Sequence, residues 1–268
     1  MSLDDLPPLR DVLAAAGISA KKSFGQHFLL DLNITRKIAR LANIAPGETV
    51  IEVGPGPGGL TRALLEAGAH VVAVEKDARF VPLLDDVAGH ADGRLQVINE
   101  DALRAALPTG AAIVANLPYN VATPLLIGWL TGPLHPRSMT LMFQKEVADR
   151  IVAAPGSKTY GRLSVLAQAL TDARIVMDLP ARAFTPPPKV ASAVVQLFPR
   201  PDRLCDDAVD RLQRLTAAAF GQRRKMLRSS LKPLGGETLC AAIGLDPSLR
   251  AEDVAVAQYV GMAALLGD

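Results

Sequence analysis

Cysteine is almost absent from this chain of 268 residues, which carries only Cys205 and Cys240. With no secretory leader recognisable, so few cysteines exclude a disulfide scaffold and predict reduced thiols in a cytoplasmic protein. The four histidines are scattered along the chain, so no His/Cys cluster has the spacing of metal ligands. We therefore expect neither structural disulfides nor a bound metal.

Long apolar runs are also missing. No stretch reaches the roughly eighteen apolar residues of a membrane-spanning helix, although 49% of the residues are hydrophobic. The formal net charge is only +2, so overall charge gives no argument for a nucleic-acid partner. The length does allow one large α/β core and a small second unit.

Seven segments have strand-like patterns: Thr49–Val53, His70–Glu75, Leu95–Ile98, Ala111–Ala115, Met139–Phe143, Ala173–Met177 and Ala193–Phe198. Helical patterns separate the first six, which predicts right-handed crossovers and a mostly parallel sheet. A proline-rich segment joins the last two and permits antiparallel pairing. From about Cys205 the pattern is helical. We predict an α/β domain over residues 1–200, with a seven-stranded mostly parallel sheet, and a small all-α domain over residues 201–268.

A glycine-rich loop follows the first strand and precedes a helical pattern. It runs from Glu52 to Thr61, and Gly54, Gly56 and Gly59 match the dinucleotide pattern G-x-G-x-x-G. Such a loop lets the backbone approach a ligand closely with its amides pointing outward. Three features favour S-adenosylmethionine over NAD: an acid, Glu52, beside a cationic ligand, two prolines that stiffen the loop, and no second nucleotide-binding half downstream.

Acidic residues end the next two strands. Glu75 lies about 20 residues past the loop, where a carboxylate can accept hydrogen bonds from both ribose hydroxyls; the alternative is a solvated acid at a strand end. Asp101, next to Ala102, can accept from the adenine amine of the cofactor. Its alternative role is to cap a helix, since Asp is a favoured N-cap residue.

The fourth strand leads into Asn116-Leu117-Pro118-Tyr119-Asn120. A residue before proline is pushed out of the helical region, so the Leu117 carbonyl and the Asn116 side-chain oxygen can both accept from one exocyclic amine. Tyr119 can lie on the face of the same planar base. The alternative is a strand-ending turn with a buried tyrosine.

These separate motifs predict one joint site. In a parallel sheet, ligands bind outside the carboxyl ends of the strands. The glycine loop, Glu75, Asp101 and Asn116 follow strands one to four, so we expect them to converge on one edge of the sheet.

A basic, acid-free segment near the C-terminus contains Arg223, Arg224, Lys225, Arg228 and Lys232. On one helix, three of these residues recur every four positions and form a stripe, while Phe220, Leu227 and Leu231 anchor a different face. The stripe predicts contact with RNA phosphates; the alternative is a solvated helical face.

Five segments, in order, resemble the ribosomal RNA adenine N6-dimethyltransferases of the kasugamycin-sensitivity type. They are Gly25–Asp31, Glu52–Thr61, Asn116–Asn120, Phe184–Val190 and the Phe-Gly-Gln-Arg-Arg-Lys segment from Phe220. The resemblance implies S-adenosylmethionine-dependent dimethylation of two adjacent adenosines in a hairpin loop near the 3′ end of 16S rRNA. The expected partner is the 30S pre-ribosomal particle, and we expect a monomer.

The resemblance also implies roles for individual residues. Asn116 would lie beside the reacting methyl group, and Phe184 would stack on the base face opposite Tyr119. Residues before the first strand would fold over the cofactor, with His27 and Leu29 contacting it through backbone groups. The implied cofactor-binding set is Gln26, His27, Leu29, Glu52, Gly54, Gly56, Glu75, Asp101, Ala102 and Asn116.

Three other functions remain open at this point. A related enzyme dimethylates adenine in large-subunit rRNA and confers antibiotic resistance, and its catalytic motif is similar. A non-catalytic assembly factor would bind pre-ribosomal RNA, although Glu75, Asp101 and Asn116 are intact. An NAD-dependent oxidoreductase has no obvious proton donor and no use for the segment Asn116–Tyr119.

Overall fold

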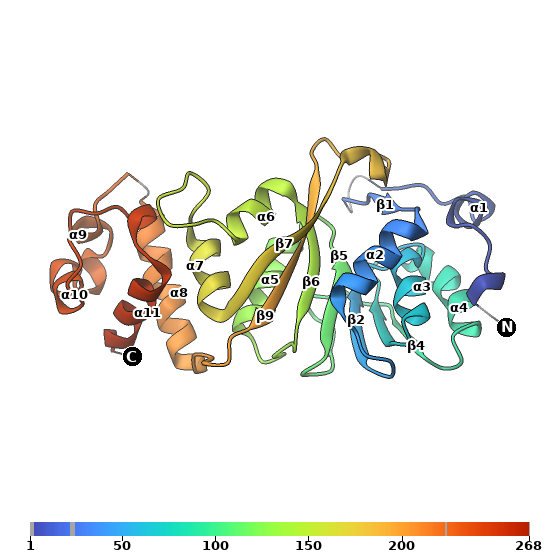
Figure 1. Ribbon diagram of the computed structural model, residues 1–268, viewed down its shortest axis with the longest axis horizontal. Helices are drawn as coiled ribbons and strands as arrows, with labels where there is room; N and C mark the ends of the chain where they lie inside the picture. Colours follow the sequence, from blue (N-terminus) through green and yellow to red (C-terminus); the bar gives the residue numbers. More distant parts are fainter. Residues whose placement is uncertain (1–2, 22–24, 223, 268) are drawn as a thin grey trace. The chain divides into compact units, whose positions relative to one another are not determined.

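The computed structural model describes residues 3–21, 25–222 and 224–267 and forms two compact units (Figure 1). The first unit comprises Met1–Trp129, Pro133–Ala148 and Ile175–Leu197, and the second comprises Leu130–Gly132, Asp149–Arg174 and Phe198–Asp268. We expected a single boundary near residue 200, but segments of the two units alternate along the chain. Tyr160, Val165 and Leu166 share a hydrophobic core with the C-terminal helices, which assigns their segment to the second unit.

All seven predicted strands are present in one sheet. Their bounds are β2 (Thr49–Val53), β3 (His70–Val74), β4 (Leu95–Ile98), β5 (Ala112–Asn116), β6 (Met139–Gln144), β7 (Thr171–Leu179) and β9 (Ser192–Pro199). The strand order is β4-β3-β2-β5-β6-β9-β7. The pairs from β4 to β6 are parallel, whereas β9 runs antiparallel to β6. The last strand thus lies between β6 and β7 rather than at the edge.

Helices that lie wholly or mostly in the first unit alternate with these strands (Figure 1). They are η1 (Leu3–Asp5), α1 (Leu9–Ala15), α2 (Leu32–Ala42), α3 (Gly59–Glu66), η3 (Ala78–Phe80), α4 (Val81–Gly89), α5 (Ala122–Thr131), α6 (Lys145–Ile151) and η4 (Ala181–Ala183). Two short strands, β1 (Phe28–Leu29) and β8 (Phe184–Thr185), form a separate antiparallel pair.

Helices dominate the second unit, as the sequence predicted. They are α7 (Arg162–Leu170), α8 (Asp206–Gly221), α9 (Leu227–Ser230), η5 (Lys232–Leu234), α10 (Gly236–Ala242), η6 (Ala251–Asp253) and α11 (Val256–Leu265). Tyr160 and Tyr259 are fully buried at its centre and donate their hydroxyls to backbone carbonyls. No helix in the described part of the chain is long and apolar enough to cross a membrane.

Helix α2 shows how local sequence fixes an element next to the glycine loop. Asp31 accepts a hydrogen bond from the Asn33 amide at 2.9 Å and so caps the first turn. Thr35, Ile38 and Ala39 are buried on one face, and the spacing of three and four residues makes the helix amphipathic. A two-bond ion pair between Arg36 and Glu66 joins α2 to α3 at 2.7 and 2.9 Å.

The N-terminal segment packs closely on the start of α3. A Cβ atom on Gly59 would lie 2.9 Å from both the Leu29 carbonyl oxygen and Leu9 Cδ1. The Arg62 guanidinium, which is buried, donates to the Pro7 carbonyl at 2.7 Å. A glycine at position 59 is therefore required for Leu9 and Leu29 to pack this closely on the start of α3.

We expect Gly59→Ala to destabilise the protein by about 1–3 kcal/mol, because the added methyl group overpacks the contact with Leu9 and Leu29. Thermal unfolding of the purified variant measures this change. Gly128→Ala is the matched control, since a Cβ there meets nothing within 4 Å on α5; it should gain up to about 1 kcal/mol. Equal effects of the two substitutions would contradict the packing argument.

Candidate active site

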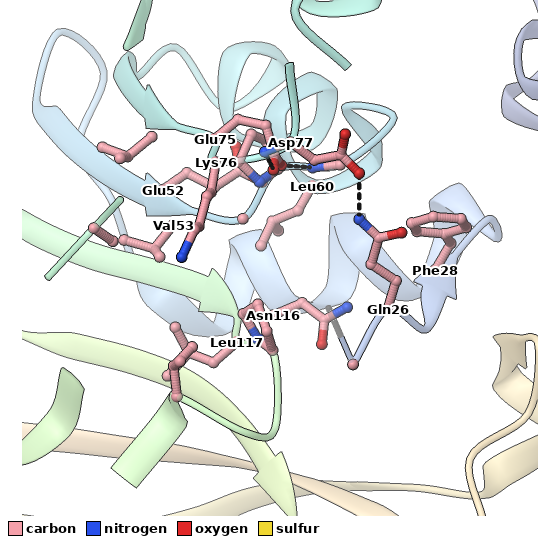
Figure 2. Close-up of a pocket in the computed structure, with 18 of the residues that line it drawn as sticks. Gln26, Phe28, Glu52, Val53, Leu60, Glu75, Lys76, Asp77, Asn116 and Leu117 are labelled. Carbon is pink, nitrogen blue, oxygen red and sulfur yellow. Dashed lines mark hydrogen bonds between the residues drawn. The ribbon is translucent and has the colours of Figure 1, made fainter. Parts of the chain in front are cut away.

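One cavity lies at the carboxyl edge of the parallel strands, as the motif positions predicted. It measures about 1130 Å³ including its open mouth. Its walls come from the ends of β2 to β5 and from the segment around β1 (Figure 2). The predicted residues on its lining are Gln26, His27, Leu29, Glu52, Gly54, Gly56, Glu75, Asp101, Ala102, Asn116, Leu117 and Tyr119.

Glu52 is the most perturbed acid of this cavity. Its side chain is 1% exposed, and Oε2 has no hydrogen-bond partner among the described residues. Burial raises the pKa of Glu52 to about 8, and the neighbouring carboxylate of Glu75 adds to the rise. A buried acid with an unsatisfied oxygen favours a cationic ligand, because a positive charge would stabilise its ionised form.

Glu75 is buried but well supported by backbone amides. Its Oε2 accepts from the Gly56 amide at 3.0 Å and its Oε1 from the Asp77 amide at 2.8 Å. Burial raises the pKa of Glu75, while these hydrogen bonds oppose the rise. Each carboxylate oxygen can accept more than one hydrogen bond, so Glu75 can still accept from two ribose hydroxyls.

The glycine loop supplies space and amides beside these acids. The φ angle of Gly54 is +69°, and a Cβ on this residue would lie 3.3 Å from Pro118 Cδ. The loop therefore passes close to the Asn116–Asn120 segment only because residue 54 has no side chain. The open loop, the orphaned Glu52 oxygen and the Glu75 carboxylate together fit a ligand that carries positive charge and a ribose. These residues therefore fit S-adenosylmethionine.

Asp101 is engaged by two neighbours. Its Oδ2 accepts from Lys76 Nζ at 2.8 Å and its Oδ1 from the Leu103 amide at 3.1 Å. Lys76 is the main reason that the pKa of Asp101 is lowered. The carboxylate thus supports its own turn and also borders the cavity next to Ala102.

Asn116 ends β5 with its amide oriented by the N-terminal segment. Nδ2 donates to the His27 carbonyl at 3.4 Å, and no donor among the described residues reaches Oδ1. The Leu117 side chain is 1% exposed and packs away from solvent. Figure 2 shows Asn116 and Leu117 on the wall across from Glu75 and Lys76.

Tyr119 is held from two sides. Its hydroxyl shares a 2.6 Å hydrogen bond with Ser192 Oγ, and its ring stacks on the His27 imidazole with centroids 5.5 Å apart. Nδ1 of His27 donates to the Pro186 carbonyl at 2.8 Å. A base stacking on Tyr119 would therefore use the ring face that His27 leaves open.

Comparison with known proteins identifies the family. The model of the family described as ribosomal RNA adenine dimethylase matches residues 17–268. The chain belongs to this family. A protein named ribosomal RNA small subunit methyltransferase A from Phenylobacterium zucineum is 67% identical over 268 residues, which cover 98% of this chain and 94% of that protein.

Two solved structures of methyltransferases have a fold similar to that of this chain. The 23S rRNA methyltransferase ErmE has a TM-score of 0.70 at 27% identity, over 89% of this chain and 99% of that one. A dimethyladenosine transferase from Plasmodium falciparum has a TM-score of 0.75 at 24% identity, over 88% and 96%. The predicted Rossmann-like class I methyltransferase fold is confirmed.

Phe184 does not lie where we expected it. Its side chain is 3% exposed and belongs to the main hydrophobic core, outside the lining of the cavity. In β8 it pairs with Leu29 of β1, and successive side chains of a strand point to opposite faces. Phe184 therefore faces the core while Thr185 faces outward, and no base-stacking surface is formed by its ring.

The basic segment does not form one helical stripe. Helix α8 ends at Gly221, and the amides of Leu227 and Arg228 bind the carbonyls of Leu249 and Pro247 at 2.8 and 3.0 Å instead of continuing a helix. Arg223 lies outside the described residues. The other four basic side chains are exposed, at Arg224, Lys225, Arg228 and Lys232. The predicted anchors Leu227 and Leu231 are fully buried, and Phe220 is partly buried.

Three residues at the site escaped the sequence analysis. Lys76 and Asp77 line the cavity, and their place directly after Glu75 could have indicated this. Ser192 reaches Tyr119 from β9, 73 positions later in the chain, and no local pattern predicts that contact.

The raised pKa of Glu52 predicts a pH-dependent stability. The folded protein binds this proton more tightly than the unfolded chain, so the contribution is present below about pH 4.5 and is lost as the pH rises to about 8. The full effect is on the order of 5 kcal/mol. As the pH is raised from 6 to 8.5 without cofactor, we expect the melting temperature of Glu52→Gln to fall less than that of the parent protein.

Melting curves of both proteins across this range test the expectation. Glu100→Gln, which removes an exposed carboxylate, should follow the parent profile. Parallel pH profiles for the parent and Glu52→Gln would show that Glu52 does not titrate in this way.

Proposed function

We propose that this chain transfers methyl groups from S-adenosylmethionine to N6 of two adjacent adenosines in a hairpin loop near the 3′ end of small-subunit rRNA. The product is N6,N6-dimethyladenosine. The observation that carries the proposal is the oriented amide of Asn116, which lies on the same cavity as Glu52 and Glu75. The family description and the name of the relative from Phenylobacterium zucineum support the rRNA substrate and the small-subunit assignment.

Asn116 and Leu117 would activate the target amine. An adenine N6 is a weak nucleophile because its lone pair is delocalised into the ring. Two acceptors, Asn116 Oδ1 and the Leu117 carbonyl, would bind its N–H bonds, favour a more tetrahedral nitrogen and stabilise the developing positive charge. Because Nδ2 is held by the His27 carbonyl, Oδ1 is the end of the amide that faces the amine.

Tyr119 would hold the base against this pair of acceptors. Ser192 and His27 fix the ring, so the base finds a preformed platform, and base stacking of this kind is worth about 1–3 kcal/mol. The target adenosine must leave its stack, which costs least in a loop. Positioning then supplies much of the remaining acceleration.

The cofactor would be held by residues from the ends of three strands, β2, β3 and β4, and from the segment around β1. S-adenosylmethionine, when bound, supplies the electrophilic methyl group. Glu75 would hold the ribose hydroxyls, Asp101 and Ala102 would border the adenine, and the Gly54–Gly56 loop with Glu52 would face the charged methionine part. His27 and Leu29 would contribute backbone groups, because the Leu29 side chain is buried in the core.

The second unit would contribute RNA contacts. Arg224, Lys225, Arg228 and Lys232 are exposed, and exposed basic side chains bind phosphates. Arg228 also lies 4.0 Å from the Glu237 carboxylate, so a phosphate there would compete with that ion pair. We include Arg223 in this set on sequence alone. The proposal has the protein acting as a monomer on the 30S pre-ribosomal particle in the cytoplasm.

The proposal is tested by transfer of tritiated methyl groups from S-adenosylmethionine to under-methylated 30S particles, with 50S particles as the control. We expect label on 30S alone, recovered as dimethyladenosine on nucleoside analysis. Label on 50S alone would assign the chain to the alternative function, dimethylation of large-subunit rRNA. Cofactor binding without label on either particle would leave a non-catalytic assembly factor.

Asn116→Ala should lower kcat by about 10²-fold or more, the usual cost of removing one group that stabilises transition-state charge. Cofactor affinity should change far less, since Asn116 acts mainly on the base. Single-turnover methylation and calorimetric binding of S-adenosylhomocysteine measure the two effects. Asn33→Ala, on the exposed face of α2, should change neither. Equal losses of turnover and cofactor affinity in Asn116→Ala would show that Asn116 does not act on the target amine as proposed.

A further inference from the structure

Asp77 is a buried acid on the cavity wall for which the chemistry above has no use. It is 6% exposed and follows Glu75 by two positions. Its backbone amide donates to Glu75 Oε1 at 2.8 Å, and the other oxygen of Glu75 accepts from Gly56. The backbone of Asp77 therefore already fixes the Glu75 carboxylate, to which the proposed function assigns the ribose.

The side chain of Asp77 points the other way and gathers two partners. Oδ2 accepts from Gln26 Nε2 at 3.0 Å, drawn in Figure 2, and from Arg79 Nη2 at 2.5 Å. Oδ1 accepts from Arg79 Nε at 2.9 Å. These charge-assisted bonds lower the pKa of Asp77 to about 2, so the carboxylate is ionised at any pH where the protein works.

Both partners bind the N-terminal segment as well. Arg79 Nη1 donates to the Ser19 carbonyl at 3.2 Å. Gln26 Oε1 accepts from the Lys21 amide at 2.9 Å and from Arg79 at 3.4 Å. Both ends of the Gln26 amide are thus occupied by protein groups. Its side chain therefore links Asp77 to the N-terminal segment, while the residue also lines the cavity.

This link ends directly before the residues that form one wall of the cavity. Phe28 lies over the glycine loop, with its ring 3.6 Å from where a Gly56 Cβ would be. His27 supplies the carbonyl that orients Asn116. Beyond Gln26, Phe28 and Leu29 form a two-residue pairing with β8, in a sheet separate from the seven-stranded one. A weaker link would therefore loosen the wall next to the glycine loop.

We propose that Asp77 is a positioning residue for the cofactor, which holds Gln26 and Arg79 so that residues 26–29 stay closed against the glycine loop and slow cofactor release. The inference rests on the proposed function, because it takes S-adenosylmethionine as the ligand. It assigns to Asp77 no contact with the reacting atoms. Its side chain acts through Gln26 and Arg79, and its amide acts through Glu75.

Asp77→Asn tests the side chain alone, because the variant keeps the backbone amide bound to Glu75 and keeps one oxygen acceptor. Loss of the charge should weaken binding of S-adenosylmethionine and S-adenosylhomocysteine about tenfold, mainly through faster dissociation. The KM for the cofactor should rise by a similar factor. At saturating cofactor, kcat on 30S particles should stay within about twofold. Stopped-flow dissociation, calorimetry and steady-state methylation measure these quantities.

Glu66→Gln is the matched control. It breaks the Arg36–Glu66 ion pair, which also joins two elements of the first unit but lies outside the cavity lining. This variant should leave cofactor affinity and dissociation rate unchanged. An equal loss of cofactor affinity in both variants would show that Asp77 acts only through the general stability of the protein, and would overturn the proposal.

A double-mutant cycle with Gln26→Ala tests whether the pair acts as a unit. If Asp77 and Gln26 act together, the cofactor affinity of the double variant should lie within about twofold of that of Asp77→Asn. Additive losses would show that Gln26 acts independently of Asp77 and would overturn the proposal. So would unchanged affinity of Asp77→Asn, or a fall in kcat that matches the rise in KM.

The two levels of proposal fail in different ways. If the parent protein binds neither S-adenosylmethionine nor S-adenosylhomocysteine, the proposed function is wrong. If the parent binds them and Asp77→Asn binds them equally well, only the positioning role of Asp77 is wrong.

Discussion

The parallel pairing of β2, β3, β4 and β5 is the constraint on which the site depends. Parallel strands carry their carboxyl ends to one edge, so whatever follows each strand meets there. The glycine loop, Glu75, Asp101 and Asn116 come from four separate stretches of sequence, yet all line one cavity. A single antiparallel strand among these four would carry one of the groups to the opposite edge. The antiparallel strand of this sheet, β9, instead brings Ser192 to Tyr119.

Two buried carboxylates with raised pKa values, Glu52 and Glu75, give the cavity its electrostatic character. Glu52 and Glu75 both have raised pKa values because burial disfavours their charge. The two acids differ in support, since Glu75 accepts two backbone amides while Glu52 keeps one oxygen without a partner among the described residues. A cationic ligand would offset the cost of ionising Glu52, whereas the phosphates of a dinucleotide would add to it. The dehydrogenase reading therefore conflicts with the charge of the site as well as with its motifs.

The N-terminal segment completes what the strand ends begin. Arg62 binds Pro7, Leu9 packs on Gly59, and Gln26 reaches Asp77, so the segment is fastened along its length to α3 and to the loop after β3. In consequence, backbone groups of residues 27–29 face the glycine loop and orient the Asn116 amide. The Asn116–Asn120 segment and the glycine loop are thus joined by one short stretch of chain. His27, in this stretch, lies 89 positions before Asn116.

The sequence by itself determined the seven strands, the glycine loop, the acids at the strand ends and the convergence of these groups, because a strand's apolar pattern and the parallel crossover rule are local or nearly local properties. It could not place Phe184 or the basic segment. Phe184 is turned into the core by the register of β8 on β1, and the amides of Leu227 and Arg228 are captured by a loop about 20 residues away. The contacts Ser192–Tyr119 and Gln26–Asp77 span 73 and 51 positions. Only the tertiary structure decided these contacts, because hydrogen bonds between distant residues depend on how the elements pack and leave no periodic signal in the chain.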